Sequence, residues 1–222
     1  MSQTLPLFPL GTVLFPGLVL PLHVFEQRYR QMVADVLEQD EPRQFGVIAI
    51  RTGRETGADG VTALYEIGCT ALLRQATRHD DGRYNLMTIG TQRFRLLGTE
   101  QSKAYLQGEV ELLTEEAGDQ EAGRLAAGAV QAAFREYLEA LANRGAAQPS
   151  IPALPDEPVE LSYLVAASVL ADVADRQALL AQPDALRRLT AERALLARET
   201  AMLRSLTSAP APQLRHAPYN PN

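Results

Sequence analysis

Residues 5–30 read LPLFPLGTVLFPGLVLPLHVFEQRYR, and no other part of the chain is as informative. The stretch opens with two short apolar runs, at 5–10 and 13–15, which are interrupted and followed by prolines. Proline lacks the N–H group that a central strand donates to its neighbours, so these runs predict the irregular edge of a small sheet or barrel. From Phe25 onward the apolar residues follow a helical period. The helix face that we expect to pack on the sheet consists of Phe25, Tyr29, Met32, Val33, Val36 and Leu37.

Short strands are predicted through the middle of the chain. Apolar or alternating runs occupy 45–50, 64–77, 84–89, 93–97 and 105–113. Asp80-Asp81-Gly82 is a hairpin turn signal, because glycine readily adopts a positive φ, whereas Gly90-Thr91-Gln92 predicts a break between two strands. The charged, glycine-containing segment 51–60 is expected to be a surface loop. Together these features favour a small, partly open β-barrel.

The composition changes at Glu115. Beyond it β-branched residues become fewer, and alanine, leucine, glutamate and arginine dominate, with one helix face expected at Val130, Phe134, Tyr137, Leu138 and Leu141. After a proline-rich connection, Pro158 suits the first turn of the next helix. A short helix is expected near 176–181, and Asp184 can cap a last helix that ends near residue 206.

The last predicted helix carries leucines at 189, 196 and 203, a seven-residue spacing. We favour a helix packed in its own bundle over a dimer seam, with a homodimer as the alternative. The predicted fold class is α+β. We expect a β-domain at 1–114, a helical bundle at 115–207 and a disordered, proline-rich tail at 208–222.

The order of these segments resembles that of a known family. The resemblance is carried by the FEQRYR helix start, the central YEIGCTALLRQATRHDDGRYNLMTIGTQRFRLL, the closing AYLQGEVELLTEE, and LSYLVAASVL followed by RQALLAQPDALRRL. Over residues 4–206 the chain resembles the Lon N-terminal domain, the substrate-recognition module at the front of the Lon ATP-dependent proteases. The resemblance implies a PUA-like β-pseudobarrel with one early helix, followed by an α-helical bundle with a long C-terminal helix.

Composition bounds the possible functions. The chain has 222 residues and a net charge of −6, which argues against a general nucleic-acid binder. No apolar run reaches about 18 residues and no secretory leader opens the chain, so we expect a cytoplasmic protein with no membrane partner. The single lysine, Lys103, is not preceded by a glycine loop. Neither P-loop nucleotide binding nor the Ser–Lys proteolytic dyad of full-length Lon is therefore expected. We predict that the chain is not an enzyme, with no catalytic residue and no cofactor.

No metal site is predicted either. The histidines, His23, His79 and His216, are far apart in the sequence, and the single cysteine, Cys69, has no clear histidine partner. A protein zinc site needs several such ligands together. Cys69 is therefore interpreted as a small core residue and not as a nucleophile.

Four charged residues are candidate ligand or interface contacts: Glu26, Arg28, Arg93 and Arg95. Glu26 is expected in the first turn of its helix, where a carboxylate interacts well with the helix dipole, four residues before Arg30. The alternative is that these residues fix the helix against the barrel. Arg93 and Arg95 alternate with Phe94, which places both arginines on one face of a strand. That face either contacts a ligand or is simply solvated.

The resemblance favours a non-catalytic module that recognises exposed apolar peptide or unfolded protein. Such a module could act as an adaptor or regulator in protein quality control, with a protease or chaperone as a further partner. Binding would use apolar surface and an open sheet edge. Two alternatives stay open: an RNA-binding accessory protein that uses the PUA-like fold, and a small-molecule sensor with a pocket between the two halves.

Overall fold

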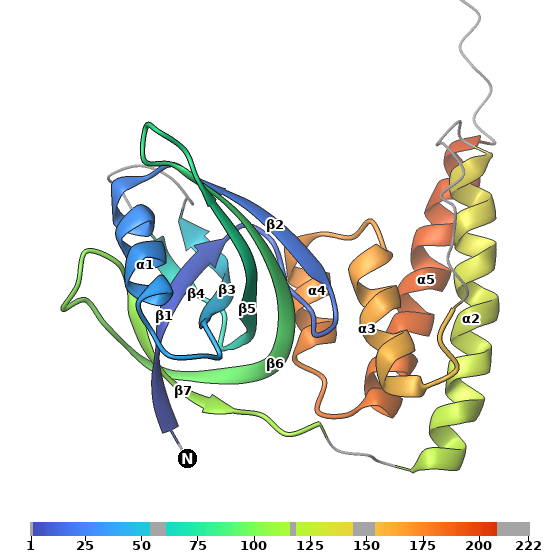
Figure 1. The fold of residues 1–222 in the computed structure, drawn as a ribbon. Coiled ribbons are helices and arrows are strands. Elements are labelled where there is room, and N and C mark those ends of the chain that lie inside the picture. Colours follow the sequence, from blue (N-terminus) through green and yellow to red (C-terminus); the bar gives the residue numbers. More distant parts are fainter. Residues whose placement is uncertain (1, 54–60, 116–118, 144–153, 208–222) are drawn as a thin grey trace, which may run out of the picture.

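The computed structural model of the chain describes residues 2–53, 61–115, 119–143 and 154–207 (Figure 1). The strands are β1 (Ser2–Leu10), β2 (Val19–Val24), β3 (Gln44–Gly53), β4 (Val61–Leu64), β5 (Ile67–Arg78), β6 (Tyr84–Glu100) and β7 (Gln107–Leu112). The helices are α1 (Gln27–Leu37), α2 (Gln120–Ala142), α3 (Pro158–Ser168), α4 (Val173–Leu180) and α5 (Ala185–Thr207). The predicted α+β class is confirmed, because a mostly antiparallel sheet with one early helix precedes a group of helices that ends in the long α5.

The sheet closes on itself. Its strand order is β1-β7-β6-β5-β3-β4, and β1 also pairs with β3, so that β1, β7, β6, β5 and β3 form a ring. The β1–β3 pair is parallel, and β2 and β4 are attached outside the ring through β6 and β3. A buried cluster that includes Leu7, Ile48, Phe94 and Val110 joins strands from around this pseudobarrel.

β1 is not the edge strand that its prolines predicted. Its first half pairs with β7, and its second half, from Leu7 onward, pairs with β3. Leu7 donates its N–H to the carbonyl of Leu106 beside β7, at 2.8 Å. Because successive N–H groups of a strand point to opposite sides, the nitrogen of Pro6 faces away from β7 and that of Pro9 faces away from β3. Each missing N–H therefore falls on a side without a partner strand. The second apolar run, at 13–15, is a buried connection and not a strand.

β6 is one continuous strand, so the predicted break at Gly90-Thr91-Gln92 is wrong. The register of β6 against β5 shifts at this point instead. A Cβ on Gly90 would overlap the carbonyl of Phe15, so the glycine permits a close approach of the loop after β1. The predicted hairpin turn before it is present, with Gly82 at a φ of 81°.

α1 packs on the pseudobarrel through the predicted apolar face, with one exception. Tyr29, Met32, Val33 and Val36 are buried, but Phe25 is 53% exposed. The helix begins at Gln27, and its N-cap residue has extended backbone, so Phe25 precedes the helix and does not share its buried face. The helical period in the sequence therefore continues past the N-terminal end of the helix itself.

The remaining helices form a second layer beside the pseudobarrel (Figure 1). α2 and α5 run side by side in the same direction, α3 packs on both, and α4 contacts β3 and β5. Pro158 occupies the first turn of α3, and the Asp184 carboxylate caps α5 through the N–H of Arg187 at 2.8 Å, both as predicted. Leu189 and Leu196 are fully buried in the core, so the leucine seam packs within the chain.

Some sequence-based expectations are not tested by this architecture. The division at 114/115 stays a prediction, although it falls between β7 and α2. The tail 208–222, most of the 51–60 loop and residues 144–153 lie outside the described residues. None of the helices in the described ranges is long and apolar enough to cross a membrane.

The two layers share a hydrophobic core. Phe15, Ala49 and Ile67 from the β-part belong to the same buried cluster as Phe134 of α2 and Leu161 of α3. Gln177 of α4 also donates to the carbonyl of Ile67 at 2.8 Å. The surfaces that flank the junction are therefore held in a fixed relation to one another, and a cleft lies along it.

Candidate functional site

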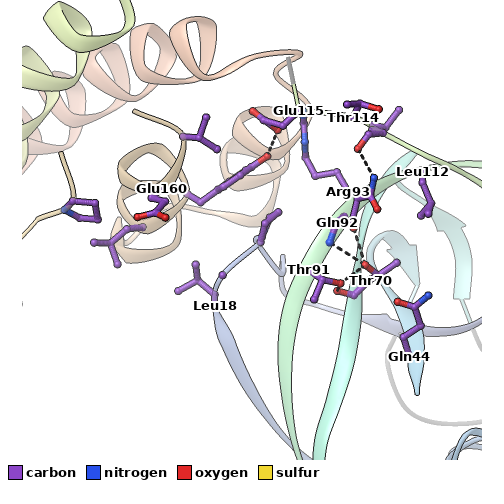
Figure 2. A pocket seen from close by; sticks show the side chains of 17 residues that line it. Leu18, Gln44, Thr70, Thr91, Gln92, Arg93, Leu112, Thr114, Glu115 and Glu160 are labelled. Carbon is purple, nitrogen blue, oxygen red and sulfur yellow. Dashed lines mark hydrogen bonds and ion pairs between the residues drawn. The ribbon is translucent and has the colours of Figure 1, made fainter. Parts of the chain in front are cut away.

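The junction between the pseudobarrel and α3 contains a cleft of about 850 Å³ that opens to solvent (Figure 2). Its walls come from the loop after β1, the start of β3, the facing parts of β5 and β6, the end of β7 and one side of α3 with the residues before it. The lining residues are Pro16, Gly17, Leu18, Gln44, Thr70, Thr91, Gln92, Arg93, Leu112, Leu113, Thr114, Glu115, Pro155, Val159, Glu160, Tyr163 and Leu164. Most of the exposed lining is apolar.

A set of hydrogen bonds fixes the strand side of the cleft. The buried Thr70 hydroxyl shares a hydrogen bond with that of Thr91 at 2.7 Å and accepts the N–H of Gln92 at 3.0 Å. The Gln92 side chain donates to the carbonyl of Leu113 at 3.1 Å. Figure 2 shows these residues across the cleft from Leu18 and Glu160. This wall is therefore preformed, because its polar groups are satisfied by one another.

Arg93 ties the pseudobarrel to the helical layer at the end of the cleft. Its side chain is 3% exposed. The guanidinium donates to the carbonyls of Leu180 at 2.9 Å and Pro183 at 3.1 Å, and also to that of Gln182. It pairs in addition with the Glu115 carboxylate at 2.8 Å. One strand residue thus holds the connection between α4 and α5, and its donors are engaged within the protein.

Glu115 is the centre of the same network. One carboxylate oxygen accepts from Arg188 of α5 at 2.8 Å, and the other accepts from Arg93 and the Tyr163 hydroxyl. The fully buried Arg188 also donates to Ser162 at 2.8 Å and stacks on the Tyr163 ring at 3.9 Å. Burial raises the pKa of Tyr163, so this hydroxyl remains a donor at neutral pH. The network joins the β-part, α3 and α5.

The polar groups that remain available in the cleft are few. The Glu160 carboxylate makes no hydrogen bond or ion pair within the described part of the chain, and its side chain is exposed. The backbone of Thr114, just past the end of β7, likewise has no hydrogen-bond partner among the described residues. An apolar cleft with an unpaired carboxylate at Glu160 and unpaired backbone groups at Thr114 is suited to binding, and its described lining shows no nucleophile–base pair.

The structure places the four predicted site residues at separate points. Glu26 is the N-cap residue of α1, one position before the expected first turn, and pairs with Arg28 at 3.0 Å. The expected pair with Arg30 is not made, because Arg30 turns to the carbonyl of Asp81 at 3.2 Å. Arg28 lines a different cleft, of about 660 Å³, beside Tyr29. Whether Glu26 and Arg28 contact a ligand stays a prediction.

The two arginines of β6 differ in a way that the sequence pattern did not indicate. Arg93 is buried, so the solvated-face interpretation is wrong for it. Arg95 is 49% exposed and pairs with Glu111 at 2.8 Å on the surface. The helical layer covers the strand at Arg93 and not at Arg95, which explains the difference. A ligand contact through Arg95 stays a prediction.

The residues missed from the sequence are Glu115, Glu160, Tyr163 and Arg188. Only weak signals existed: Glu115 stands at the change of composition, and Arg188 lies beside a leucine of the heptad pattern. Glu115 contacts Tyr163 and Arg188, which are 48 and 73 positions away, and contacts over such separations cannot be read from local periodicity.

Two histidines do come together. The rings of His23 and His79 lie 6.4 Å apart, and His23 shares a 2.6 Å hydrogen bond with Asn85. Across the described ranges, however, no three His, Cys, Asp or Glu side chains are grouped so that they could hold a metal ion. His216 lies outside those ranges.

Comparisons with known proteins agree with the fold. Lon protease 2 of Myxococcus xanthus is 28% identical over 206 residues, which are 92% of this chain and 24% of that protein. Lon protease 2 of Syntrophobacter fumaroxidans is 26% identical over 187 residues, 83% of this chain and 23% of that protein. The chain thus spans about a quarter of the length of these curated relatives.

Two solved structures are similar along nearly their whole length. A Lon N-terminal domain protein from Xanthomonas campestris is 26% identical, with a TM-score of 0.59 over 88% of this chain and 98% of that one. The N-terminal domain of a Mycobacterium avium complex Lon protease is 18% identical and shares the fold, with a TM-score of 0.59 over 90% of this chain and 98% of that one. The model of the ATP-dependent protease La (LON) substrate-binding domain matches residues 4–198. The chain therefore belongs to the family of the Lon substrate-binding domain.

Proposed function

We propose that the chain recognises exposed apolar segments of non-native polypeptides, and that the cleft between the pseudobarrel and α3 binds them. The observation that carries the proposal is the character of the cleft: about 850 Å³, open to solvent and lined mostly by apolar groups. Apolar surface of this kind on a soluble domain typically serves binding.

The cleft suits an extended chain in two respects. Leu18, Val159 and Leu164 supply apolar contacts for side chains. The N–H and C=O of Thr114, two residues past the end of β7, have no partner among the described residues and can exchange hydrogen bonds with the backbone of an extended segment. Hydrogen bonds to the backbone do not depend on the sequence of the bound segment. Apolar contacts favour unfolded polypeptides, because the apolar residues of folded proteins are mostly buried.

In this proposal the module is not catalytic. It presents clients as a cytoplasmic adaptor or regulator in protein quality control, and a protease or chaperone acts on them. RNA binding and small-molecule sensing are the competing functions. A small-molecule sensor would be favoured by an enclosed pocket, whereas this cleft opens to solvent.

The proposal is tested by titrating the chain with a fluorescent, permanently unfolded polypeptide and, separately, with a single-stranded RNA. We expect polypeptide binding that changes little between low and moderate salt. Phosphate contacts would instead make log affinity fall with log salt, with a slope of about −0.7 per contact for a single strand. Salt-sensitive RNA binding without polypeptide binding would overturn the proposal.

The site is tested with Leu164→Asp, which places a charge on the α3 wall of the cleft. Burial of a leucine side chain is worth roughly 1.5–3 kcal/mol, so we expect affinity to fall about tenfold or more. The matched control is Leu125→Asp on α2, since Leu125 is 74% exposed and lies outside the cleft. Equal losses in the two variants would place the binding surface elsewhere.

A further inference from the structure

The charged residues that line the cleft differ in whether they form ion pairs within the protein. Its charged lining residues are Arg93, Glu115 and Glu160. Glu115 pairs with both Arg93 and Arg188 at 2.8 Å, so this network contains two cations and one carboxylate. Both terminal guanidinium nitrogens of Arg93 and both carboxylate oxygens of Glu115 are engaged in hydrogen bonds within the protein. The arginines of this network are buried, whereas Glu160 is exposed and has no ion pair among the described residues, so Glu160 is the accessible charge on the α3 wall.

Glu160 is placed to act on a ligand, in addition to the favourable interaction of its charge with the N-terminus of α3. It lies in the first turn of α3 and faces the cleft, and within the described ranges no cation or donor contacts its carboxylate. The residue four positions later on the same helix face is Leu164, which also lines the cleft. A negative charge and an apolar wall are thus presented side by side.

We infer that the cleft selects extended apolar segments that carry a lysine or arginine next to their apolar residues, with the cation at Glu160. This inference rests on the proposed function and narrows its substrate class. The apolar residues fill the space beside Leu18 and Leu164, and the long side chain of the basic residue reaches the carboxylate at the rim. A segment with an acidic residue at that position is disfavoured, because it meets a like charge.

The preference for a basic residue should be small, because the Glu160 carboxylate is exposed to solvent. An ion pair at a solvent-exposed position gives a preference of roughly 1.4-fold to fivefold for the basic over the neutral segment, which corresponds to about 0.2–1 kcal/mol. The contribution is screened by salt, so the preference narrows at high ionic strength while apolar binding persists.

The test uses three fluorescent peptides that share one apolar core and differ at one flanking position, which is Lys, Gln or Glu. The wild-type chain is expected to bind them in the order Lys, Gln, Glu. Glu160→Gln removes the preference, and Glu160→Lys inverts it. The matched control is Glu157→Gln, because Glu157 is exposed, precedes the same first turn of α3 and lines a different depression. That variant keeps the wild-type order.

The outcomes separate this inference from the function on which it rests. If none of the three peptides binds, and the unfolded polypeptide does not bind either, the proposed function fails. If all three bind the wild-type chain equally, the proposed function stands and the selectivity is overturned. A preference for the Lys peptide that survives in Glu160→Gln overturns the role of Glu160.

Discussion

Cys69 shows how position within the sheet controls reactivity. The side chain is fully buried in β5, and burial raises the pKa of its thiol to about 12, against the smaller opposing effects of a backbone hydrogen bond and Arg93. The thiolate is the reactive species. We predict that iodoacetamide labels Cys69 only very slowly in the native chain at pH 8 and rapidly in urea, as followed by mass spectrometry. Fast native labelling would mean that β5 opens locally.

Glu192 is a buried carboxyl without a hydrogen-bond partner in the part of the chain that the structure describes. The residue is 0% exposed, and neither carboxylate oxygen has a hydrogen bond within the described residues. Burial raises the pKa of Glu192 well above its ordinary value of 4.5, and the charge of Arg188, one helical turn earlier, opposes this only in part. The folded chain therefore favours the protonated form of Glu192.

The pH dependence of stability follows from this raised pKa. Below pH 4.5 the side chain is protonated in both states, and as the pH rises the unfolded chain ionises first, so stability is lost. Glu192→Gln cannot ionise. We expect it to match the wild type near pH 4 and to exceed it by about 1 kcal/mol or more at pH 8. Urea unfolding at both pH values measures the difference, and a gap that does not widen with pH contradicts the interpretation.

Among the elements, α1 gives the clearest contrast between two apolar residues in one sequence pattern. Met32 is fully buried, whereas Phe25 is 53% exposed. Truncation of a buried methionine typically costs about 2–5 kcal/mol, and exposed substitutions usually stay within about 0.5 kcal/mol. Met32→Ala should therefore lower the melting temperature markedly, and Phe25→Ala should hardly change it. Calorimetry on the two variants decides, and equal melting temperatures would show that α1 does not dock as described.

Elements with local chemical signals could be predicted from the sequence. The buried face of α1, the turn at Gly82 and the cap at Asp184 each depend on residues within a few positions of one another. Family resemblance added the order of the elements and the α+β class. These features need no knowledge of which strand lies beside which.

The errors at the element scale share a cause. Pro6 and Pro9 are tolerated because β1 changes partners between them, and Gly90 is needed because another segment passes close by. Proline and glycine are unusual residues within strands, and the sequence identifies them as such. Why each is tolerated depends on a segment that is distant in sequence. Local rules therefore predict a sheet edge at β1 and a strand break at Gly90, and both predictions are wrong.

At the scale of the whole molecule, the candidate site was the least predictable part. The cleft is assembled from six segments that are separated in sequence, and Glu160 has no local pattern that distinguishes it from other exposed glutamates. Arg93 and Arg95 were indistinguishable as a pair of alternating strand residues. Only the placement of the helical layer over one of them separates their roles.

That placement gives a matched pair of substitutions. Arg93 and Arg95 lie two positions apart on β6, and each pairs with a glutamate at 2.8 Å, but their side chains are 3% and 49% exposed. Removing one partner of a buried pair typically costs about 3–5 kcal/mol, whereas an exposed pair contributes about 0–1 kcal/mol. Arg93→Ala should therefore be strongly destabilising in urea unfolding, and Arg95→Ala nearly neutral.

The loss in the Arg93 variant should also be localised. The carbonyls of Leu180 and Pro183 lose their donor, so hydrogen exchange should quicken in the connection between α4 and α5 before it changes in the ring strands. Arg93→Lys, with a single ammonium in place of the planar guanidinium, should be intermediate. Uniform exchange across both layers would mean that Arg93 supports the strand alone. Equal stability of the two alanine variants would mean that the two layers are held together by their shared apolar core and not by this arginine.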